Sequence, residues 1–496
     1  MNNLLIVKKT EITPYLPKRN TRIHPNKILE SVQTKYSNPS KHILKSREFN
    51  GIISVKGDVI HMKYVRRIVD EQLDRRLKAF NAVNIVGPKG CGKTRTAKER
   101  CKTVIEFQDE LKRDSYLSIA EISPNLFLDN EKPILFDEWQ DAPKIWGMIR
   151  KVCDDSPGVT GEYFLTGSTS RHVDTPHTGT GRITTITMWP MTLYETGESN
   201  GKVSLIKLLC EDDYTIDGAK NELELRDLFF AACRGGWPRC IELSDDKAKL
   251  EIAGDYYSQI YSTDVSSVDG VKRNSDWTRT ILWSYARNMA TLAKRGSILT
   301  DIKANHDISD TTIDSYITAL KQLFVLEDID AWTPQIRSKT SIRTAKKHIF
   351  VDPSIGVSAL GLSPEYFAKD LDTFGHVFEN MVLRDLMVYA QAHDARVMHY
   401  SDNIGLEADA VFQLNDGRYA LIEVKLGANA IPAAEKELLK FSDIIKKHNE
   451  KALENQEHPG VVYREPEQLI IICGNAPMAY TTKNGVKVIP AGCLRD

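Results

Sequence analysis

A glycine-rich segment at residues 87–94 constrains the fold of this chain more than any other feature. Its sequence, Gly87-Pro-Lys-Gly-Cys-Gly-Lys93-Thr94, matches the pattern GxxxxGK(S/T) at every fixed position. Glycines in this pattern let the backbone wrap around a phosphate and point its N–H groups at it. The apolar run Ala82–Val86 precedes the segment, and a basic, polar helix start follows it. This order predicts a strand, a phosphate-binding loop and a helix, which together begin a parallel α/β sheet.

The loop predicts a site for ATP and Mg²⁺. Lys93 is expected to reach the β- and γ-phosphates, and Thr94 is expected to ligate the metal ion. The alternative is a glycine turn that binds no nucleotide. The residues predicted to contact the nucleotide are Gly87, Pro88, Lys89, Gly90, Cys91, Gly92, Lys93, Thr94 and Arg95.

A second apolar run, Pro133-Ile-Leu-Phe-Asp137-Glu138, ends in an acidic pair. Open α/β sheets bind their ligands at the carboxyl ends of the strands. Asp137 is therefore predicted to hold the Mg²⁺ shell, and Glu138 to polarise the attacking water as a general base. Such a pair often faces solvent when it stands alone, but 44 residues after the loop lysine it favours the catalytic interpretation.

A third run, Tyr163–Leu165, continues into Thr166-Gly-Ser168. If this strand lies beside the acidic one, Thr166 or Ser168 would sit near the γ-phosphate; the alternative is a strand followed by an ordinary turn. Farther along, Arg182 follows two glycines in Gly179-Thr-Gly181-Arg182. A mobile arginine there would stabilise phosphoryl-transfer charge, in cis or from a neighbouring subunit, and a plain surface arginine is the alternative.

Carboxylates also gather in the C-terminal part of the sequence. The alternating segment Ala420-Leu-Ile-Glu423-Val-Lys425-Leu predicts a strand with Glu423 and Lys425 on one face. Asp409 belongs to the preceding strand, and Glu379 to an earlier helix. A metal-dependent phosphodiesterase needs carboxylates to hold Mg²⁺ and a lysine to act on the water.

In that interpretation Asp409 and Glu423 ligate the metal, Lys425 assists the water, and Glu379 completes the shell. Glu407 is a spare candidate. The alternative is an exposed strand that carries a simple Glu/Lys ladder, because an ExK triplet is common.

Residues 297–352 predict a helix–turn–helix followed by a basic loop. Asn305-His-Asp turns the chain, and Ser309 is a suitable N-cap for the second helix. The exposed face of that helix is at best weakly basic: Thr311, Thr312, Asp314, Ser315 and Lys321. The loop is better suited to contact phosphates as a wing, with five basic residues and no acid: Arg337, Lys339, Arg343, Lys346 and Lys347. A solvated loop on a structural unit is the alternative.

Charge and cysteine content narrow the classes of protein. The 496 residues hold 66 Lys and Arg against 67 Asp and Glu, which excludes a uniformly basic nucleic-acid coat protein. Residues 1–65 alone hold 12 basic and 4 acidic residues, so the charge is segregated. Eight scattered cysteines without a CxxC pair are typical of reduced thiols, and no apolar run is long enough for a membrane span. The expectation is a cytoplasmic chain with no membrane partner.

Together these motifs resemble those of the prokaryotic AAA-type P-loop ATPases whose C-terminal half carries a long uncharacterised domain. The resemblance runs from about residue 64 to about residue 480. The matching strings are YVRRIVD (64–70), GPKGCGKT, LFDEWQDAP, FLTGS, HTGTGR, WPMTLYE (189–195), GGWPR (235–239), HIFVDPS (348–354), GHVFEN (375–380), EADAV and ALIEVKLG. The resemblance implies an ATPase core, then a winged-helix-like unit and then a domain similar to PD-(D/E)xK nucleases.

The expected fold class is thus a multidomain α/β chain with a parallel-sheet P-loop core and a C-terminal domain similar to restriction endonucleases. The predicted units are a basic arm at 1–62, the ATPase core at 63–200, a helical lid at 201–296, a winged-helix-like unit at 297–352 and the nuclease-like domain at 353–496.

The predicted activity is Mg²⁺-dependent ATP hydrolysis coupled to binding or cleavage of nucleic acid, with DNA as the partner and a homo-oligomer as one assembly. The alternative is an ATP-operated switch that binds DNA or protein and carries an inactive nuclease-like domain. A protein-remodelling ATPase is a third hypothesis, and it lacks a recognisable aromatic pore loop in the sequence.

Overall fold

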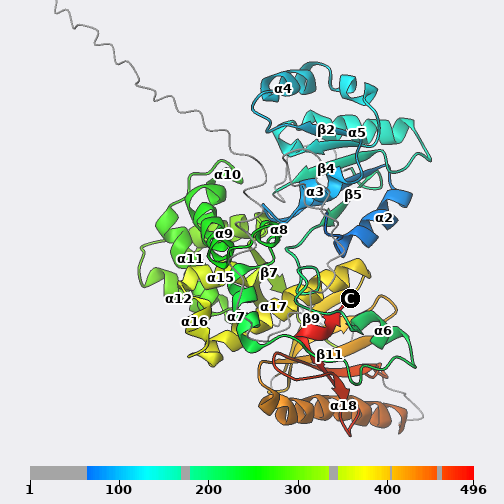
Figure 1. Ribbon diagram of the computed structural model, residues 1–496, viewed down its shortest axis with the longest axis vertical. Coiled ribbons are helices and arrows are strands. Elements are labelled where there is room, and N and C mark those ends of the chain that lie inside the picture. Colours follow the sequence, from blue (N-terminus) through cyan, green and yellow to red (C-terminus); the bar gives the residue numbers. More distant parts are fainter. Residues whose placement is uncertain (1–63, 169–178, 335–344, 403–404, 455–460) are drawn as a thin grey trace, which may run out of the picture. The chain divides into compact units, whose positions relative to one another are not determined.

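The computed structural model describes residues 64–168, 179–334, 345–402, 405–454 and 461–496 (Figure 1). The basic arm predicted at 1–62 lies outside these ranges. Among the described helices, none combines the length and the apolar character that a membrane crossing requires. All eight cysteines fall within the described ranges and none forms a disulfide.

The first sheet is parallel throughout and has the strand order β2-β3-β4-β1-β5, which confirms the predicted α/β core. The three apolar runs of the sequence form its central strands. The two edge strands had no clear sequence signal, because β2 is only partly buried and β5 is rich in threonine. The strands are β1 (Ala82–Val86), β2 (Thr103–Glu106), β3 (Ile134–Asp137), β4 (Tyr163–Gly167) and β5 (Ile183–Thr187).

Helices cover both faces of this sheet, and each face has its own apolar core. On one face Val83, Ile85 and Phe164 pack against Leu73 of α2. On the other face the aromatic side chain of Phe136 packs with residues of α4, α5 and a 3₁₀ segment. The helices are α2 (Val69–Ala79), α3 (Lys93–Lys98), α4 (Arg113–Ile122) and α5 (Lys144–Asp155), with 3₁₀ segments η1 (Pro124–Asp129) and η2 (Trp139–Asp141).

A helical region follows from residue 225. Helix α7 ends at Arg234, directly before the GGWP string, and Gly235 has a positive φ of 76°. Ser309 caps α13 as predicted, with its Oγ accepting from Thr312 N at 3.2 Å. The elements are α7 (Leu225–Arg234), α8 (Pro238–Ile241), α9 (Asp246–Gln259), the π-helix η3 (Ile260–Asp264), α10 (Val265–Ser267), α11 (Ser275–Arg287), α12 (Arg295–Lys303), α13 (Asp310–Gln322), β7 (Leu326–Ile329), β8 (Lys347–Phe350), α15 (Pro353–Leu360) and α16 (Pro364–Phe367).

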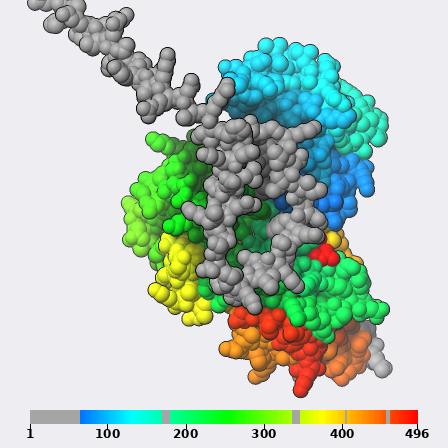
Figure 2. Space-filling model, viewed as in Figure 1, coloured from blue at the N-terminus to red at the C-terminus, as the bar shows by residue number. Residues whose placement is uncertain are grey.

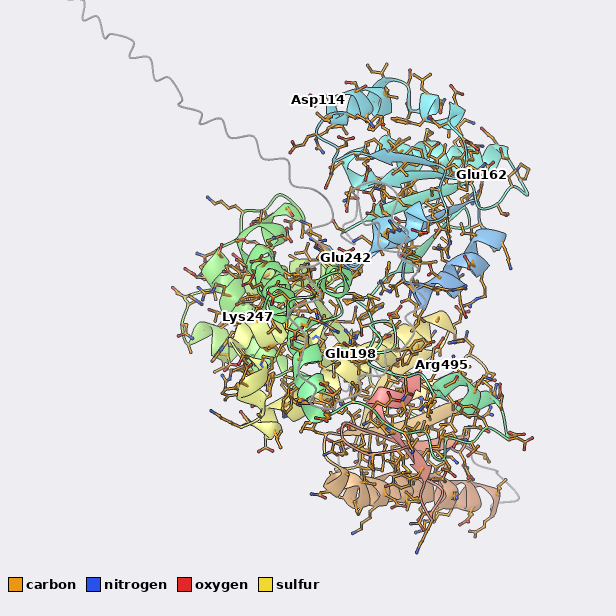
Figure 3. All side chains as sticks on the ribbon, viewed as in Figure 1. Asp114, Glu162, Glu198, Glu242, Lys247 and Arg495 are labelled. Carbon is orange, nitrogen blue, oxygen red and sulfur yellow. The ribbon has the colours of Figure 1, made fainter. Side chains whose placement is uncertain are left out.

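Two contacts bear on the predicted boundaries between units, which stay a prediction. Residues 201–224 were assigned to the helical lid, but β6 (Val203–Ser204) pairs in parallel with the C-terminal strand β15 (Leu494–Arg495). The Arg495 side chain, labelled in Figure 3, donates from Nε to the Gly201 carbonyl at 3.1 Å. Figure 2 shows this green segment against the red C-terminal residues. Apolar periodicity could not reveal a pairing between strands almost three hundred residues apart.

The second contact concerns α15, which is predicted to belong to the nuclease-like domain. It packs against α7, α9 and α11, and also against α17 (Leu371–Ala392), and its first five residues are buried. Helix α15 therefore contacts helices of both predicted units.

The second sheet is mixed and has the order β13-β14-β12-β11-β10-β9. Helix α17 covers one face, where it packs on Ile422 and Val424, and α18 covers the other, where it packs on Leu421. The strand predicted from the alternation at 420–426 and the preceding strand with Asp409 are both present. The elements are α6 (Leu205–Cys210), α17 (Leu371–Ala392), β9 (Arg396–Ser401), β10 (Glu407–Gln413), β11 (Tyr419–Lys425), the 3₁₀ segment η4 (Ala428–Ala430), α18 (Ile431–Glu454), β12 (Gln468–Cys473), β13 (Tyr480–Thr481), β14 (Lys487–Pro490) and the 3₁₀ segment η5 (Ala491–Cys493).

Candidate functional site

The glycine-rich loop joins β1 to α3 and uses backbone conformations that only glycine adopts easily. Gly87 has φ 150°, and a Cβ there would lie 2.1 Å from the Met188 carbonyl oxygen. Gly92, with φ 107°, stands at the N-cap of α3. Any side chain at Gly87 would clash with backbone, so the loop depends on glycine for its path.

The loop borders a cavity of about 460 Å³, a volume typical of small-molecule sites. Eight of the residues predicted for the nucleotide site line it, namely Lys89, Gly90, Gly92, Lys93, Thr94, Arg95, Glu138 and Ser168. Gln108, which follows β2, also lines the cavity and was not predicted.

Three other loop residues support the cavity from behind. The carbonyls of Gly87 and Pro88 accept hydrogen bonds from Lys93 Nζ at 2.9 and 2.8 Å. Cys91 is fully buried and packs into the apolar core below α2. The Lys93 ammonium is thus held at the inner wall of the loop, and only 5% of the residue is exposed.

Two hydroxyls converge on one carboxylate oxygen beside the loop. Thr94 Oγ1 donates to Asp137 Oδ1 at 2.7 Å, and Thr166 Oγ1 donates to the same oxygen. Sheet register explains the meeting, because Asp137 is paired with Thr166 across β3 and β4, and β4 adjoins β1. Carboxylate and hydroxyl oxygens suit Mg²⁺, so this donor set fits the metal ion that the sequence predicts.

Glu138 is held in a special conformation. It has φ 54°, an uncommon value for a residue with a side chain, and it is the N-cap of the short segment η2. Its Oε2 accepts from both the backbone N and the Oγ of Ser168 at 3.2 Å, and also from Gln140 Nε2. The ends of β3 and β4 therefore fix this carboxylate at the edge of the cavity.

Arg67 anchors the back of the loop to the rest of the ATPase core. Its guanidinium donates to the carbonyls of Cys91 and Trp189, each at 2.8 Å, and pairs with Glu195 Oε1 at 2.9 Å. The arginine is only 5% exposed, so its charge is balanced by Glu195 within the fold. This contact ties the YVRRIVD and WPMTLYE strings to the loop.

A second contact ties the loop to the helical region. Lys89 Nζ lies 2.6 Å from Asp264 Oδ1, and Asp264 ends the π-helix η3. Single π-helical turns occur frequently at functional sites. Because Lys89 also lines the cavity, a phosphate bound there would compete with Asp264 for the lysine ammonium.

The structure does not bring Arg182 to the cavity. It directly precedes β5, and Ile183 is paired with Ala82 at the start of β1, whereas the loop follows the end of β1 at Val86. Arg182 Nε forms an ion pair with Asp154 at 2.7 Å instead. The strand length separates the two ends of the sheet by roughly 13 Å, which does not favour the predicted role in cis. A role from a neighbouring subunit, which needs a homo-oligomer, stays a prediction.

The C-terminal carboxylates do come together. Lys425 Nζ lies 2.5 Å from Glu423 Oε2 and 3.2 Å from Asp409 Oδ2. Asp409 also accepts the backbone N–H of Val424 at 2.8 Å, and it sits where the pairing of β10 with β9 shifts register. Such a bulge re-aims a side chain. We call Glu379, Asp409, Glu423, Lys425 and Lys347 the carboxylate–lysine cluster.

Lys347 is the unexpected member. It was predicted to contact phosphates from a wing, but its side chain is 8% exposed and its Nζ lies 2.6 Å from Glu379 Oε1 and 3.6 Å from Asp409 Oδ1. The wing role is wrong for this residue, because an ammonium enclosed by carboxylates cannot reach a phosphate. Lys346 pairs with Asp330 at 2.8 Å, and the other three basic residues of that loop lie outside the described ranges.

Two further predictions for the C-terminal part concern Glu407 and the metal ligands. Glu407 is exposed, lies outside the cluster and accepts a bond from Ser401 Oγ at 3.3 Å. The ligand roles of Asp409 and Glu423 stay a prediction. Within the described ranges no group of three or more His, Cys, Asp or Glu side chains is arranged to hold a metal ion. The reason is geometric, since lysine ammoniums stand between the carboxylates.

The predicted DNA-facing helix carries little free positive charge. Asp314 pairs with Arg295 at 2.7 Å, and Lys321 pairs with Asp328. Lys303 of the preceding helix pairs with Asp310. The basic side chains around this turn are therefore paired with acids of the same region.

Burial shapes the protonation of the cluster. Burial, with the charge of Asp409, raises the pKa of Glu379 and that of Glu423 to about 7. Burial acts the same way on Asp409, but Lys347 and Lys425 outweigh it and lower the pKa of that carboxyl. The pKa of Lys347 is raised by Glu379 and Asp409 against the effect of burial. Both lysines therefore stay charged, and Asp409 is the firmly ionised centre.

A neighbouring histidine gives a pH prediction. Burial, together with the charge of Lys347, lowers the pKa of His399 from 6.5 to about 4. Below pH 6.5 the imidazole of His399 binds a proton in the unfolded chain but stays neutral in the folded chain. The free energy of unfolding therefore decreases as the pH falls from 6.5 towards 4. At pH 5 the loss attributable to His399 is about 2 kcal/mol.

Urea unfolding at pH 7.5 and pH 5 checks this, with His399→Gln expected to lose less stability than the wild type over that interval. The exposed His376 of α17 provides the control variant His376→Gln, which should behave as the wild type. An equal acid loss in His399→Gln would contradict the assignment.

Sequence reasoning missed Gln108, Gln140, Arg67 and Asp264 around the loop, and the cluster role of Lys347. Arg67 and Gln140 lie within strings that carry the family resemblance, and this could have marked them as candidate site residues. Gln108 and Asp264 gave none, because only tertiary contacts bring them to the loop. The polar and basic residues around Lys347 in the sequence predicted an exposed side chain, whereas the side chain is buried.

Comparison with known proteins assigns the N-terminal part. Residues 79–197 match the model of an AAA domain. Residues 225–366 and 374–494 match two separate domains of unknown function, DUF8612 and DUF4143. No curated protein sequence matches the chain.

Two solved structures are similar to parts of the chain. A Walker-type ATPase of Pyrococcus abyssi shares 12% identity with a TM-score of 0.36, covering 60% of this chain and 96% of that one. A signal transduction ATPase with numerous domains and a tetratricopeptide repeat sensor, from Pyrococcus horikoshii, shares 12% identity with a TM-score of 0.19, covering 67% of this chain and 50% of that one.

The loop, the acidic strand end, the parallel sheet and the family match agree with one another. Residues 79–197 match an AAA domain and carry a P-loop on a parallel sheet, which supports an AAA-type P-loop ATPase, and two further regions of the same chain match domains of unknown function.

Proposed function

We propose that this chain binds and hydrolyses Mg·ATP, and that its nucleotide state controls contacts made by the rest of the chain. The observation that supports hydrolysis is the convergence of Lys93, Thr94, Asp137 and Glu138 at the carboxyl edge of one parallel sheet. These are the residue types that hold a triphosphate, hold its metal ion and activate water.

Each residue has a defined task in this proposal. Lys93 would balance the charge of the β- and γ-phosphates, and Thr94 and Asp137 would hold Mg²⁺. When bound, Mg²⁺ supplies charge neutralisation at the phosphate oxygens. Glu138 would accept a proton from the attacking water; Ser168 and Gln140 both bond its Oε2, so they orient the carboxylate without engaging Oε1.

The direct experiment is phosphate release from ATP by the full chain. We expect turnover in Mg²⁺ that stops when EDTA removes the metal. A chain that binds ATP in Mg²⁺ but never releases phosphate would refute hydrolysis and leave binding alone.

The switch part of the proposal rests on the ion pair between Lys89 and Asp264. Since Lys89 lines the cavity, phosphates would draw its ammonium away from η3 and loosen that contact with the helical region. This would convert nucleotide binding into movement of a neighbouring element.

Replacing Asp264 with asparagine removes the competition for Lys89. We expect Asp264→Asn to bind ATP more tightly by a factor of up to about five, because a partly exposed ion pair contributes up to about 1 kcal/mol. Calorimetric titration measures the change. Asp246→Asn, at an exposed position at the start of α9, is the matched control. Weaker or unchanged binding in Asp264→Asn would count against the coupling.

The second part concerns nucleic acid. Two hypotheses remain from the sequence: DNA cleavage at the C-terminal carboxylates, and nucleotide-dependent binding without cleavage. The lysines inside the carboxylate–lysine cluster favour the second hypothesis, because they occupy the space between the carboxylates. Arg295, Lys303 and Lys321 are ion-paired, so the helix–turn–helix itself offers little free positive charge for this binding. Incubating DNA with the chain and Mg²⁺ or Mn²⁺, with and without ATP, separates them. We expect intact DNA and binding that varies with salt and nucleotide.

A further inference from the structure

The carboxylate–lysine cluster contains its own cation. Lys347 Nζ lies 2.6 Å from Glu379 Oε1, 3.3 Å from the Asp409 carbonyl oxygen and 3.6 Å from Asp409 Oδ1. These three oxygens come from two elements, helix α17 and strand β10. An ammonium surrounded by such oxygens stands where a hard metal ion would have to stand to bind them.

The electrostatics leave little room for a second cation. Three carboxylates carry at most three negative charges, and Lys347 and Lys425 bring two positive charges against them. The side chains of Lys347 and Glu423 are less than one-tenth exposed, so solvent screens them weakly. A divalent ion added here would face two ammoniums at short range and would give the cluster a net positive charge.

The position of Lys347 is set by backbone contacts and not by a free side chain. Lys347 begins β8, and β8 is fixed to α17 by Phe350, whose N–H and carbonyl both bond the Asn380 side chain at 2.8 Å. Asn380 directly follows Glu379 on α17. The strand and the carboxylate are therefore held together as one unit.

The two partners come from different regions of the chain. Lys347 lies in the region matched at 225–366, and Glu379, Asp409 and Glu423 lie in the region matched at 374–494. The lysine thus joins the helical region to the C-terminal sheet through buried charge. Removing one member of such a pair leaves an uncompensated buried charge, which is strongly destabilising.

We infer that Lys347 acts as an internal cation that occupies a latent divalent-metal site, so that the intact chain binds no metal at Asp409 and cuts no phosphodiester there. Removing this ammonium converts the cluster into a site for a divalent cation held by Glu379, Asp409 and Glu423. The inference goes beyond the proposed ATP hydrolysis and does not depend on it, because no nucleotide-binding residue takes part.

The test uses Mn²⁺ binding to the full chain without nucleotide, measured by electron paramagnetic resonance. We expect the wild type and Asp409→Asn to bind Mn²⁺ equally, because the cluster of the wild type holds no Mn²⁺. We expect Lys347→Ala to bind one additional Mn²⁺ at least tenfold more tightly than the wild type does, and Lys347→Ala/Asp409→Asn to lose it. Lys440→Ala is the matched control, since Lys440 also faces a carboxylate, Glu437, at 3.5 Å but on the exposed side of α18.

Loss of folding in Lys347→Ala is covered by a second measurement. If the variant is unstable, Mn²⁺ should raise its melting temperature and leave those of the wild type and of Lys440→Ala unchanged, because a ligand that binds only the folded state stabilises it. The inference is overturned if wild-type Mn²⁺ binding disappears in Asp409→Asn. It is equally overturned if Lys347→Ala neither binds Mn²⁺ nor is stabilised by it. ATP hydrolysis by the wild type is unaffected by either result, so the two proposals fail separately.

Discussion

Lys93→Ala is expected to remove nearly all nucleotide binding and, with it, ATP turnover. The Lys93 ammonium is buried at the inner wall of the loop, where water screens its charge only weakly. Truncating a buried, hydrogen-bonded charge that pairs with a ligand costs roughly 2–5 kcal/mol, which corresponds to a loss of affinity of about thirtyfold to several thousandfold. Titration calorimetry with ATP and Mg²⁺ measures this directly.

The same lysine also bonds the carbonyls of Gly87 and Pro88, so a fold control is needed. Lys98→Ala removes a lysine from the other end of α3, where it pairs with Glu106 at 2.5 Å at the surface. This control should bind ATP as the wild type does. Equal ATP affinity in Lys93→Ala and in the wild type would falsify the assignment of the loop as the phosphate site.

Glu138→Gln is expected to separate binding from turnover. The amide has the size of the carboxylate and can still accept the Ser168 hydrogen bonds, so ATP should bind with wild-type affinity. It cannot accept a proton from water, and a positioned general base contributes about 10²–10⁴-fold to a rate. The expected phenotype is a chain that retains ATP and turns over at least a hundredfold more slowly.

Phosphate release and retention of labelled ATP measure the two halves of this phenotype. Glu121→Gln, at an exposed position of α4, is the matched control because it makes the same chemical change away from the cavity. If Glu138→Gln hydrolyses ATP at the wild-type rate, the general base must be another residue. Gln108 would then be the next residue to test, since it lines the same cavity.

Local sequence predicted the site around the phosphate-binding loop better than the carboxylate–lysine cluster. In the ATPase domain the loop, the acidic strand end and Thr166 followed one another at the ends of apolar runs, and the parallel sheet brought them together. In the C-terminal part Asp409, Glu423 and Lys425 were also identified, and they do meet. The sequence did not show that Lys347, about sixty residues upstream of Asp409, joins them. Their metal chemistry stays a prediction.

The places of Arg182 and of residues 201–224 also could not be predicted from local sequence. A glycine-flanked arginine is suited to a mobile role in any loop, but only strand register shows that it stands at the wrong end of β5. Likewise, Val203 and Ser204 carry no mark of their partner at the C-terminus. Such features depend on which distant segment packs nearby.

The sequence by itself determined the phosphate-binding loop, its strand and the acidic pair, because backbone wrapping and strand alternation are local properties. It also identified the carboxylates of the second sheet, since period-2 alternation sets which residues share a face. Only the tertiary structure decided that Asp264 reaches the loop, that Arg182 does not, and that Lys347 fills the carboxylate cluster. Charge pairing in a folded chain depends on the distance between the groups and on their burial. Neither quantity can be calculated from the spacing of residues along the sequence.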